Sequence, residues 1–141
     1  MSDTVFISNI ISNNIDGIEF CYYDTFFERL RINFPFYGTQ INYDLLKNLR
    51  ICDSDYIDEK LCISFINEIL DDGLIAGESV CSGDACTEGV IKCNVNKISN
   101  LLPDLLSYPQ YYYISSPDFD WIIVITMRLI AFGFSPVVHI Q

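Results

Sequence analysis

The segment from Tyr111 to Ile125, "YYYISSPDFDWIIVI", constrains the fold of this chain more than any other stretch. Aromatic and aliphatic residues flank a turn-forming Ser-Pro-Asp sequence, and the second flank opens on the chain's single tryptophan. That second flank is apolar enough to require a strand buried on at least one face. We therefore expect an antiparallel hairpin with strands at 110–115 and 121–126, followed by a third strand at 129–134.

A helix is predicted by strong apolar periodicity between residues 61 and 70. The spacing i, i+1, i+4, i+5, i+8, i+9 gives one continuous apolar stripe. The stripe consists of Leu61, Cys62, Phe65, Ile66, Ile69 and Leu70. Asp55, Asp58 and Glu59 precede it, where the positive end of the helix dipole favours carboxylates. Gly73 follows it and can adopt the left-handed conformation that ends many helices.

Weaker patterns predict the remaining elements. Helices are expected at 5–11, 25–32, 43–51 and 97–108, and strands at 18–23 and 89–95. The expected N-caps of the last three helices are Asp24, Asn42 and Asn96. The residues expected to face inward are Leu45, Leu46 and Leu49 in one helix and Ile98, Leu101, Leu102 and Leu105 in another. The segment 73–89 is rich in glycine and small polar residues, and is expected to be an irregular loop.

The order of these elements indicates the fold class. Helices fall mostly in the middle of the chain and strands at both ends, which is typical of α+β proteins. The length of 141 residues suits one domain, and no linker-like stretch divides the chain. We therefore expect residues 1–141 to form a single α+β domain, with an antiparallel sheet packed against three to four helices.

Charge is the strongest compositional signal. Nineteen acidic residues face eight basic ones, which gives a formal net charge of −11 and a pI near 4.1. Such a surface repels nucleic-acid phosphates and attracts a basic partner, although acidity also keeps an apolar chain soluble. We assign the clustered acids to a partner-binding surface, which consists of Asp53, Asp55, Asp58, Glu59, Asp71, Asp72, Glu78, Asp84, Asp118 and Asp120.

No segment of the sequence indicates export or membrane insertion. Asp3 stands where a secretory signal would carry positive charge. The most apolar stretch, 121–134, is shorter than the roughly 20 residues that a transmembrane helix needs, and it contains Arg128. We therefore expect a cytoplasmic protein that makes no membrane contact.

Six cysteines raise the question of a metal or redox site. Cys81, Cys86 and Cys93 form a C-x4-C-x6-C arrangement, which differs from the two close pairs typical of structural zinc. Without an export signal, free thiols are expected, while a reversible Cys81–Cys86 disulfide remains open.

The sequence contains no recognisable catalytic set. His139 is the only imidazole, so it is the only histidine base for a serine or cysteine nucleophile. The chain has no glycine-rich phosphate-binding motif, and no pair of its many carboxylates stands out. We therefore expect neither enzymatic activity nor a bound metal or cofactor.

Within the hairpin, a strand with tyrosines leads through a short acidic turn into a strand that begins with tryptophan and ends in Val-Ile-Thr. The residues of this pattern are Tyr112, Tyr113, Ser115, Ser116, Asp118, Trp121, Val124, Ile125 and Thr126. The pattern resembles a segment of the immunity proteins of bacterial contact-dependent growth inhibition and related polymorphic toxin systems. The resemblance covers this hairpin alone. After Thr126 the sequence departs from it, because "MRLIAFGF" has no acidic or glycine turn.

This resemblance implies a function. Immunity proteins bind the toxin domain, often a basic nuclease, and block its active site or exclude its substrate. The sequence therefore favours a cytoplasmic inhibitor of a cognate basic toxin, with Tyr37, Tyr111 and Phe119 as aromatic anchors. Two alternatives remain open. One is a small metal-binding or redox protein that uses the three clustered cysteines, and the other is a non-catalytic adaptor that dimerises through a sheet edge.

Overall fold

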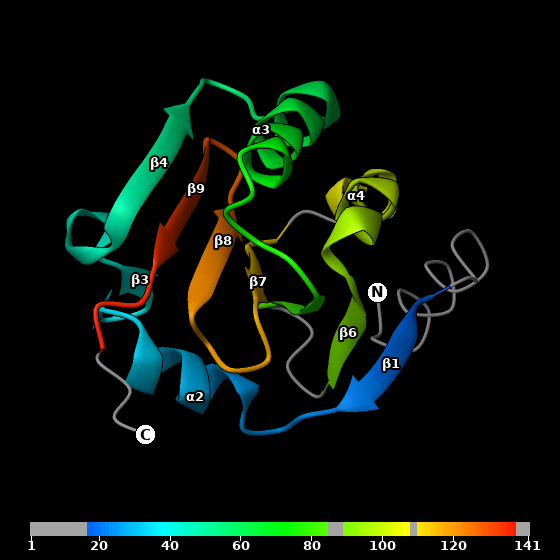
Figure 1. Ribbon diagram of the computed structural model, residues 1–141. Helices are drawn as coiled ribbons and strands as arrows, with labels where there is room; N and C mark the ends of the chain where they lie inside the picture. Colours follow the sequence, from blue (N-terminus) through cyan, green and yellow to red (C-terminus); the bar gives the residue numbers. More distant parts are fainter. Residues whose placement is uncertain (1–16, 85–88, 108–109, 138–141) are drawn as a thin grey trace.

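The computed structural model of the chain describes residues 17–84, 89–107 and 110–137. The helix expected at 5–11 lies outside these ranges, as do Cys86 and His139. Seven antiparallel strands form one sheet in the order β1-β6-β5-β7-β8-β9-β4 (Figure 1). The strands are β1 (Glu19–Tyr22), β4 (Lys47–Asp53), β5 (Glu78–Gly83), β6 (Gly89–Asn94), β7 (Tyr112–Ser115), β8 (Trp121–Ile125) and β9 (Leu129–Phe134).

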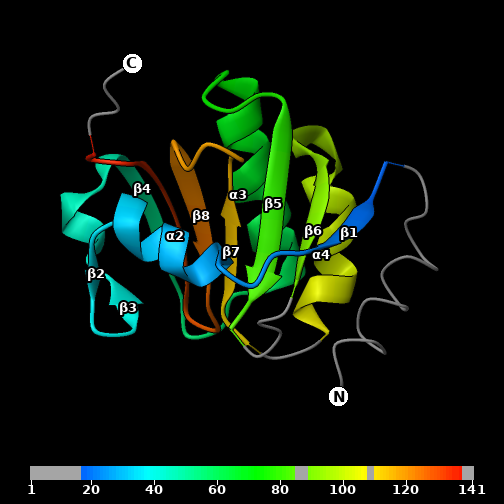
Figure 2. The same ribbon diagram turned by 90° about the horizontal axis from the view of Figure 1, so that it is seen from below.

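Both faces of the sheet are covered. Helices α3 (Glu59–Asp71) and α4 (Ile98–Leu106) lie on one face (Figure 1). Helix α2 (Phe26–Asn33) and the hairpin of β2 (Phe36–Tyr37) and β3 (Gln40–Ile41) lie on the other (Figure 2). The predicted α+β class with an antiparallel sheet is therefore confirmed. The three helices of the described ranges agree with the three to four expected.

The two faces explain why β8 lacks alternating polar residues. Ile123 and Ile125 pack into the core under α3 and α4, whereas Ile122 and Val124 pack into the core under α2. Every residue of β8 is buried as a result. A strand covered on both sides reads as a continuous apolar run, which is the pattern that predicted it.

Helix α3 forms where its apolar periodicity predicted. Asp58 is its N-cap, and the Asp58 Oδ1 atom accepts a hydrogen bond of 2.8 Å from the Leu61 backbone N–H. At the other end Gly73 adopts φ +70°, and the Leu74 N–H donates back to the Ile69 carbonyl at 3.2 Å. This left-handed ending satisfies carbonyls that the helix would otherwise leave without partners.

The other two helices were predicted with the wrong caps. Helix α2 begins after Thr25, with no side-chain cap from Asp24 or Thr25. A 3₁₀ turn, Val95–Lys97, precedes α4, and it is Asn94 whose side chain accepts from the Asn96 N–H at 3.1 Å. The inward face of α4 was predicted correctly, because Ile98, Leu101, Leu102 and Leu105 are all buried.

The helix predicted at 43–51 is wrong. Residues Tyr43–Leu45 make a 3₁₀ turn that no Asn42 side chain caps, and the chain then enters strand β4. Leu46 is buried against Gly133 of β9, where an added Cβ would lie 2.6 Å from the Leu46 Cβ, whereas Leu45 is exposed. Pairing with β9, which is remote in sequence, overrides a local leucine spacing that also fits a helix.

The loop predicted at 73–89 is wrong at Gly89, which begins β6, and at Glu78–Gly83, which forms strand β5 between β6 and β7. Its small polar residues are buried with their hydroxyls satisfied. Ser79 Oγ donates to the Cys93 carbonyl at 2.9 Å, and Ser82 Oγ donates to the Gly89 carbonyl at 2.9 Å. These bonds offset the cost of burying hydroxyl groups in a sheet.

The hairpin predicted at 110–126 is confirmed as β7 and β8, together with the third strand, β9. At the β7–β8 turn the Asp120 N–H donates to Ser116 Oγ at 2.8 Å, and Phe119 adopts φ 60°. At the β8–β9 turn Thr126 Oγ1 accepts from the Arg128 and Leu129 N–H groups, at 3.2 and 3.0 Å. The threonine hydroxyl organises this second turn, which has neither glycine nor an acid.

Candidate functional site

The antiparallel register divides the predicted binding acids between the two ends of the sheet. Asp53 ends β4, and the segment that follows it carries Asp55, Asp58 and Glu59 into α3. Asp84 follows β5 at the same end of the sheet, on the face covered by α2. Glu78, Asp118 and Asp120 lie at the opposite end, and Asp71 and Asp72 close α3. All of these acids are exposed, and the largest group within one segment is that from Asp53 to Glu59.

Three of the acids also have a structural role. Asp58 caps α3, and Asp84 Oδ1 accepts from the Tyr111 N–H at 3.2 Å. Asp72 Oδ2 lies 2.6 Å from Nη1 of Arg50, which is the one salt bridge within the described residues. Asp53, Asp55 and Glu59 therefore have no ion-pair partner in that part of the chain, and their charges remain available to a binding partner.

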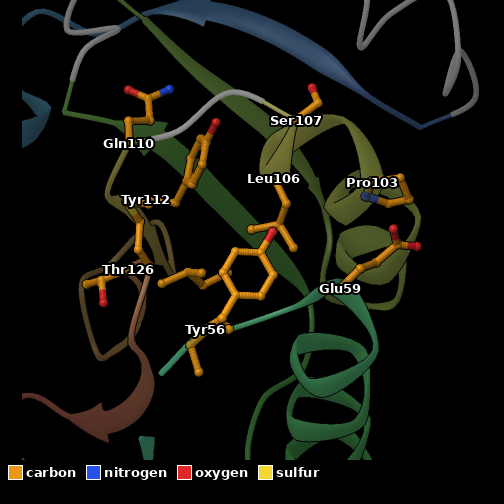
Figure 3. A pocket seen from close by; sticks show the side chains of 11 residues that line it. Tyr56, Glu59, Pro103, Leu106, Ser107, Gln110, Tyr112 and Thr126 are labelled. Carbon is orange, nitrogen blue, oxygen red and sulfur yellow. The ribbon is translucent and has the colours of Figure 1, made fainter. Parts of the chain in front are cut away.

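A hollow of about 260 Å³ opens beside this acidic segment (Figure 3). It lies between the start of α3, the end of α4 and the strands β7 and β8. Its lining consists of Tyr56, Ile57, Glu59, Pro103, Leu106, Ser107, Gln110, Tyr112, Ile125, Thr126 and Met127. Glu59 is the one charged residue in this lining.

Two exposed apolar side chains stand at the hollow. Tyr56 is 68% exposed and Met127 is 58% exposed. Backbone hydrogen bonds hold their two segments together, since the Ile57 N–H donates to the Met127 carbonyl and the Ser54 N–H donates to the Arg128 carbonyl, both at 2.9 Å. We call Asp53, Asp55, Tyr56, Asp58, Glu59 and Met127 the α3-entry surface.

The acids of this surface were predicted from the sequence, but Tyr56, Met127 and the hollow were not. The one available signal was the position of Tyr56, an aromatic residue inside the acidic run from Asp53 to Glu59. Met127 could not be found in this way, because it reaches the surface only through the pairing of the β4–α3 segment with the β8–β9 turn.

The predicted aromatic anchors have different environments. Tyr37 is exposed on β2, and Tyr111 is partly buried. Phe119 is buried, with its ring centroid 6.0 Å from that of Phe26 and with the Arg29 guanidinium 5.7 Å from the ring centroid. Phe119 is therefore a core residue, and its prediction as an exposed anchor is wrong.

Asp58 combines a cap with a charge, and the two roles can be separated by substitution. We expect Asp58→Ala to lower the free energy of unfolding by about 0.5–2 kcal/mol, because the Leu61 N–H loses its acceptor. Asp58→Ser keeps a capping oxygen and should stay within about 0.5 kcal/mol of the parent. Urea denaturation measures both values. Equal losses in the two variants would mean that charge, and not the cap, is what matters at this position.

Two of the three clustered cysteines, Cys81 and Cys93, lie in the core under α3 and α4. Cys81 and Cys93 are free thiols with almost no exposed surface. Burial raises the pKa of both, and the neighbouring Cys93 raises the pKa of Cys81 further. Reactive cysteines have a lowered pKa and solvent access, so these two thiols do not have the properties that a redox site requires.

No group of three or more histidine, cysteine or acidic side chains is arranged to hold a metal ion in the described ranges. Within the same ranges, no helix has the length and apolar character needed to cross a membrane.

No model of a known protein family matches the sequence, and the search of curated proteins found no match. Function is therefore inferred from the α3-entry surface and from the charge of the chain.

Proposed function

We propose that this protein is a cytoplasmic immunity protein that binds a cognate basic toxin domain, such as a nuclease, and blocks its active site or its access to substrate. The observation that carries this proposal is the α3-entry surface. There, exposed carboxylates that have no ion-pair partner among the described residues lie in the same segment as the exposed side chain of Tyr56, and this segment is hydrogen-bonded to the turn that carries exposed Met127. The hairpin resemblance to immunity proteins supports the same conclusion.

The charge of the chain suits an inhibitor of a nucleic-acid enzyme. A toxin that cleaves RNA or DNA needs a positive cleft, and a protein with a net charge of −11 presents carboxylates in place of phosphates. Complementary charge of this kind accelerates association by about 10- to 1,000-fold at low salt. It contributes more to the association rate and to specificity than to the lifetime of the complex.

The apolar side chains of the α3-entry surface would contribute a desolvated contact, which charged side chains cannot provide. Tyrosine and methionine are enriched in protein interfaces, whereas carboxylates are depleted from interface centres. Tyr56 and Met127 would form the desolvated centre of the contact, with Asp53, Asp55 and Glu59 at its rim. The charges at the rim would then mainly set the association rate, and the two apolar side chains at the centre would mainly set the dissociation rate.

The adaptor alternative has one supporting observation. Among the described strands, β4 pairs only with β9, so its other edge is open. An open edge can pair with a second copy of the chain. Sedimentation of the purified protein tests this alternative, which requires a dimer, whereas the inhibitor proposal is compatible with a monomer.

The inhibitor proposal is tested by capture followed by protection. The tagged chain is used to capture partners from its native cells at low and then high salt, and each captured protein is identified by mass spectrometry. Each is then expressed in a neutral host with and without this chain. We expect one basic protein that arrests growth alone and permits growth when the chain is co-expressed. If no captured protein is toxic, or if the chain does not restore growth, the proposal is wrong.

A matched pair of variants tests the surface itself. The triple variant Asp53→Asn, Asp55→Asn and Glu59→Gln removes three charges from the α3-entry surface. The control, Asp24→Asn, Asp44→Asn and Glu68→Gln, removes three exposed charges elsewhere. We expect the association rate with the toxin to fall about tenfold more in the first variant than in the control at low salt. Equal changes in the two variants would place the interface elsewhere.

A further inference from the structure

We propose that the hollow beside α3 is a socket for one basic side chain of the partner, with arginine as its best occupant. This inference rests on the proposed function, because it names the chemistry by which the α3-entry surface recognises its target. It concerns the hollow that Tyr56 and Glu59 line, which the acids alone do not define.

The size of the hollow favours a single side chain over a small-molecule ligand. Pockets for cofactors and small substrates commonly enclose about 300–1,000 Å³, and this one is smaller, at about 260 Å³. It is open to solvent at its mouth, and Tyr56, one of its lining residues, is 68% exposed. A space of this kind suits a single side chain that enters from another protein.

The lining matches the two parts of an arginine side chain. Buried or half-buried aliphatic residues, among them Ile57, Leu106 and Ile125, form apolar walls that can cover its methylene stem. In Figure 3 the Tyr56 ring stands over the hollow near Leu106, and the Glu59 carboxylate lies on the α3 side, toward Pro103. A guanidinium can stack on the tyrosine ring and donate hydrogen bonds to a carboxylate as an ion pair, and a neutral side chain cannot form such a pair.

Polar groups in the lining are largely occupied by the fold. The Ser107 hydroxyl donates to the Asp104 carbonyl at 2.6 Å, and the Tyr112 hydroxyl donates to the Leu105 carbonyl. Thr126 Oγ1 already accepts from two backbone N–H groups of the β8–β9 turn. Glu59 has no cation within ion-pair distance in the described ranges, so it is the group on which a charged occupant would depend.

The electrostatic balance at the mouth is negative. The N-terminus of a helix carries about half a positive charge, which by itself would oppose a cation. Here Asp58 and Glu59 place two negative charges in the first turn of α3, and Asp58 also occupies the Leu61 N–H. Asp53 and Asp55 add two more, against two bases, Lys60 in the first turn of α3 and Arg128 in the facing turn. A cation is therefore favoured at the mouth and an anion is not.

Nuclear magnetic resonance with small probes tests the socket without the toxin. The probe is N-acetyl-arginine amide, and the matched probe is N-acetyl-citrulline amide, which has nearly the same shape without the charge. We expect saturable shifts of the Ile125 and Leu106 methyl signals with a Kd on the order of 1–10 mM, the weak affinity of a single side chain. Citrulline should bind at least fivefold more weakly, and N-acetyl-lysine amide more weakly than arginine.

Variants assign the binding to named groups. Glu59→Gln and Tyr56→Ala each change an exposed residue, so both should fold, and each should weaken arginine binding at least fivefold. The control Glu68→Gln removes a charge further along α3 and should leave binding unchanged. Tighter binding of lysine than of arginine would overturn the choice of occupant.

Equal binding of arginine and citrulline, or no saturable shift, would overturn the socket altogether. Either result would leave the growth-protection experiment unaffected, because that experiment does not depend on the hollow. A chain that binds arginine but gives no protection would instead refute the proposed function and leave the socket in place.

Discussion

Truncation of Leu102 to alanine is expected to lower the free energy of unfolding by about 2–5 kcal/mol. Leu102 is 0% exposed and lies in the core between the sheet and the helices α3 and α4. Removal of its branched end leaves a cavity in a close-packed interior, and the surrounding side chains relax only partly. Because small domains are stable by about 5–15 kcal/mol in total, this one change removes a large fraction of the stability.

Leu45 provides the matched control for that experiment. It is 56% exposed in the 3₁₀ turn before β4, so Leu45→Ala should change the free energy of unfolding by less than about 0.5 kcal/mol. Urea denaturation of both variants gives the comparison. If Leu45→Ala were as costly as Leu102→Ala, the turn at 43–45 would be incorrect, and the inward-facing helix suggested by the leucine spacing would be favoured again.

Alkaline pH is expected to destabilise the protein strongly, beginning near pH 9. Burial raises the pKa of Cys62 from 9.0 to about 12 and the pKa of Tyr43 and Tyr113 from 10.0 to about 12. The unfolded chain therefore releases these protons at a lower pH than the folded protein does. The stabilisation is complete below pH 9 and is lost as the pH rises toward 12, with each group contributing up to about 1.4 kcal/mol per pH unit.

Denaturation midpoints at pH 8, 9, 10 and 11 measure this loss. Tyr113→Phe removes one of the ionising groups, and its stability should fall less steeply with pH above 10 than that of the parent. Tyr37→Phe is the control, because Tyr37 is 85% exposed and its substitution should leave the slope unchanged. A midpoint that stays constant from pH 8 to 11 would contradict the predicted burial of these groups.

The parts of the fold that were predicted correctly are those with local signals. Helix α3 has both a complete apolar stripe and a capping carboxylate, and the β7–β8–β9 strands are long apolar runs separated by turn-forming residues. Strand β4 has no such signal, because its leucine spacing fits a helix and only the remote strand β9 decides the outcome. Strand β5 was missed because Ser79 and Ser82 resemble loop residues until their carbonyl partners on β6 are known.

The candidate site likewise combines features that the sequence predicts with features that depend on contacts between remote segments. Composition predicted an acidic surface, and the acids are indeed exposed. It did not predict that Glu78 and Asp118 would lie at the opposite end of the sheet from Asp53, since that separation follows from strand order. Tyr56 and Met127, which are 71 positions apart in sequence, both line the hollow because the Ile57 N–H donates to the Met127 carbonyl, and no local sequence pattern predicts that pairing.

The strand order also determines when this protein can fold during its synthesis. Strand β4 ends at Asp53, but its partner β9 begins only at Leu129, 76 residues later. At about 5–20 residues per second, a ribosome needs roughly 4–15 s to cover that interval. Until then β4 has no partner among the described strands, and the turn carrying Met127 has yet to form. Nascent chains therefore contain the acidic segment well before they contain the surface that we propose binds the toxin, so protection would follow the number of finished molecules and not the number of chains in progress.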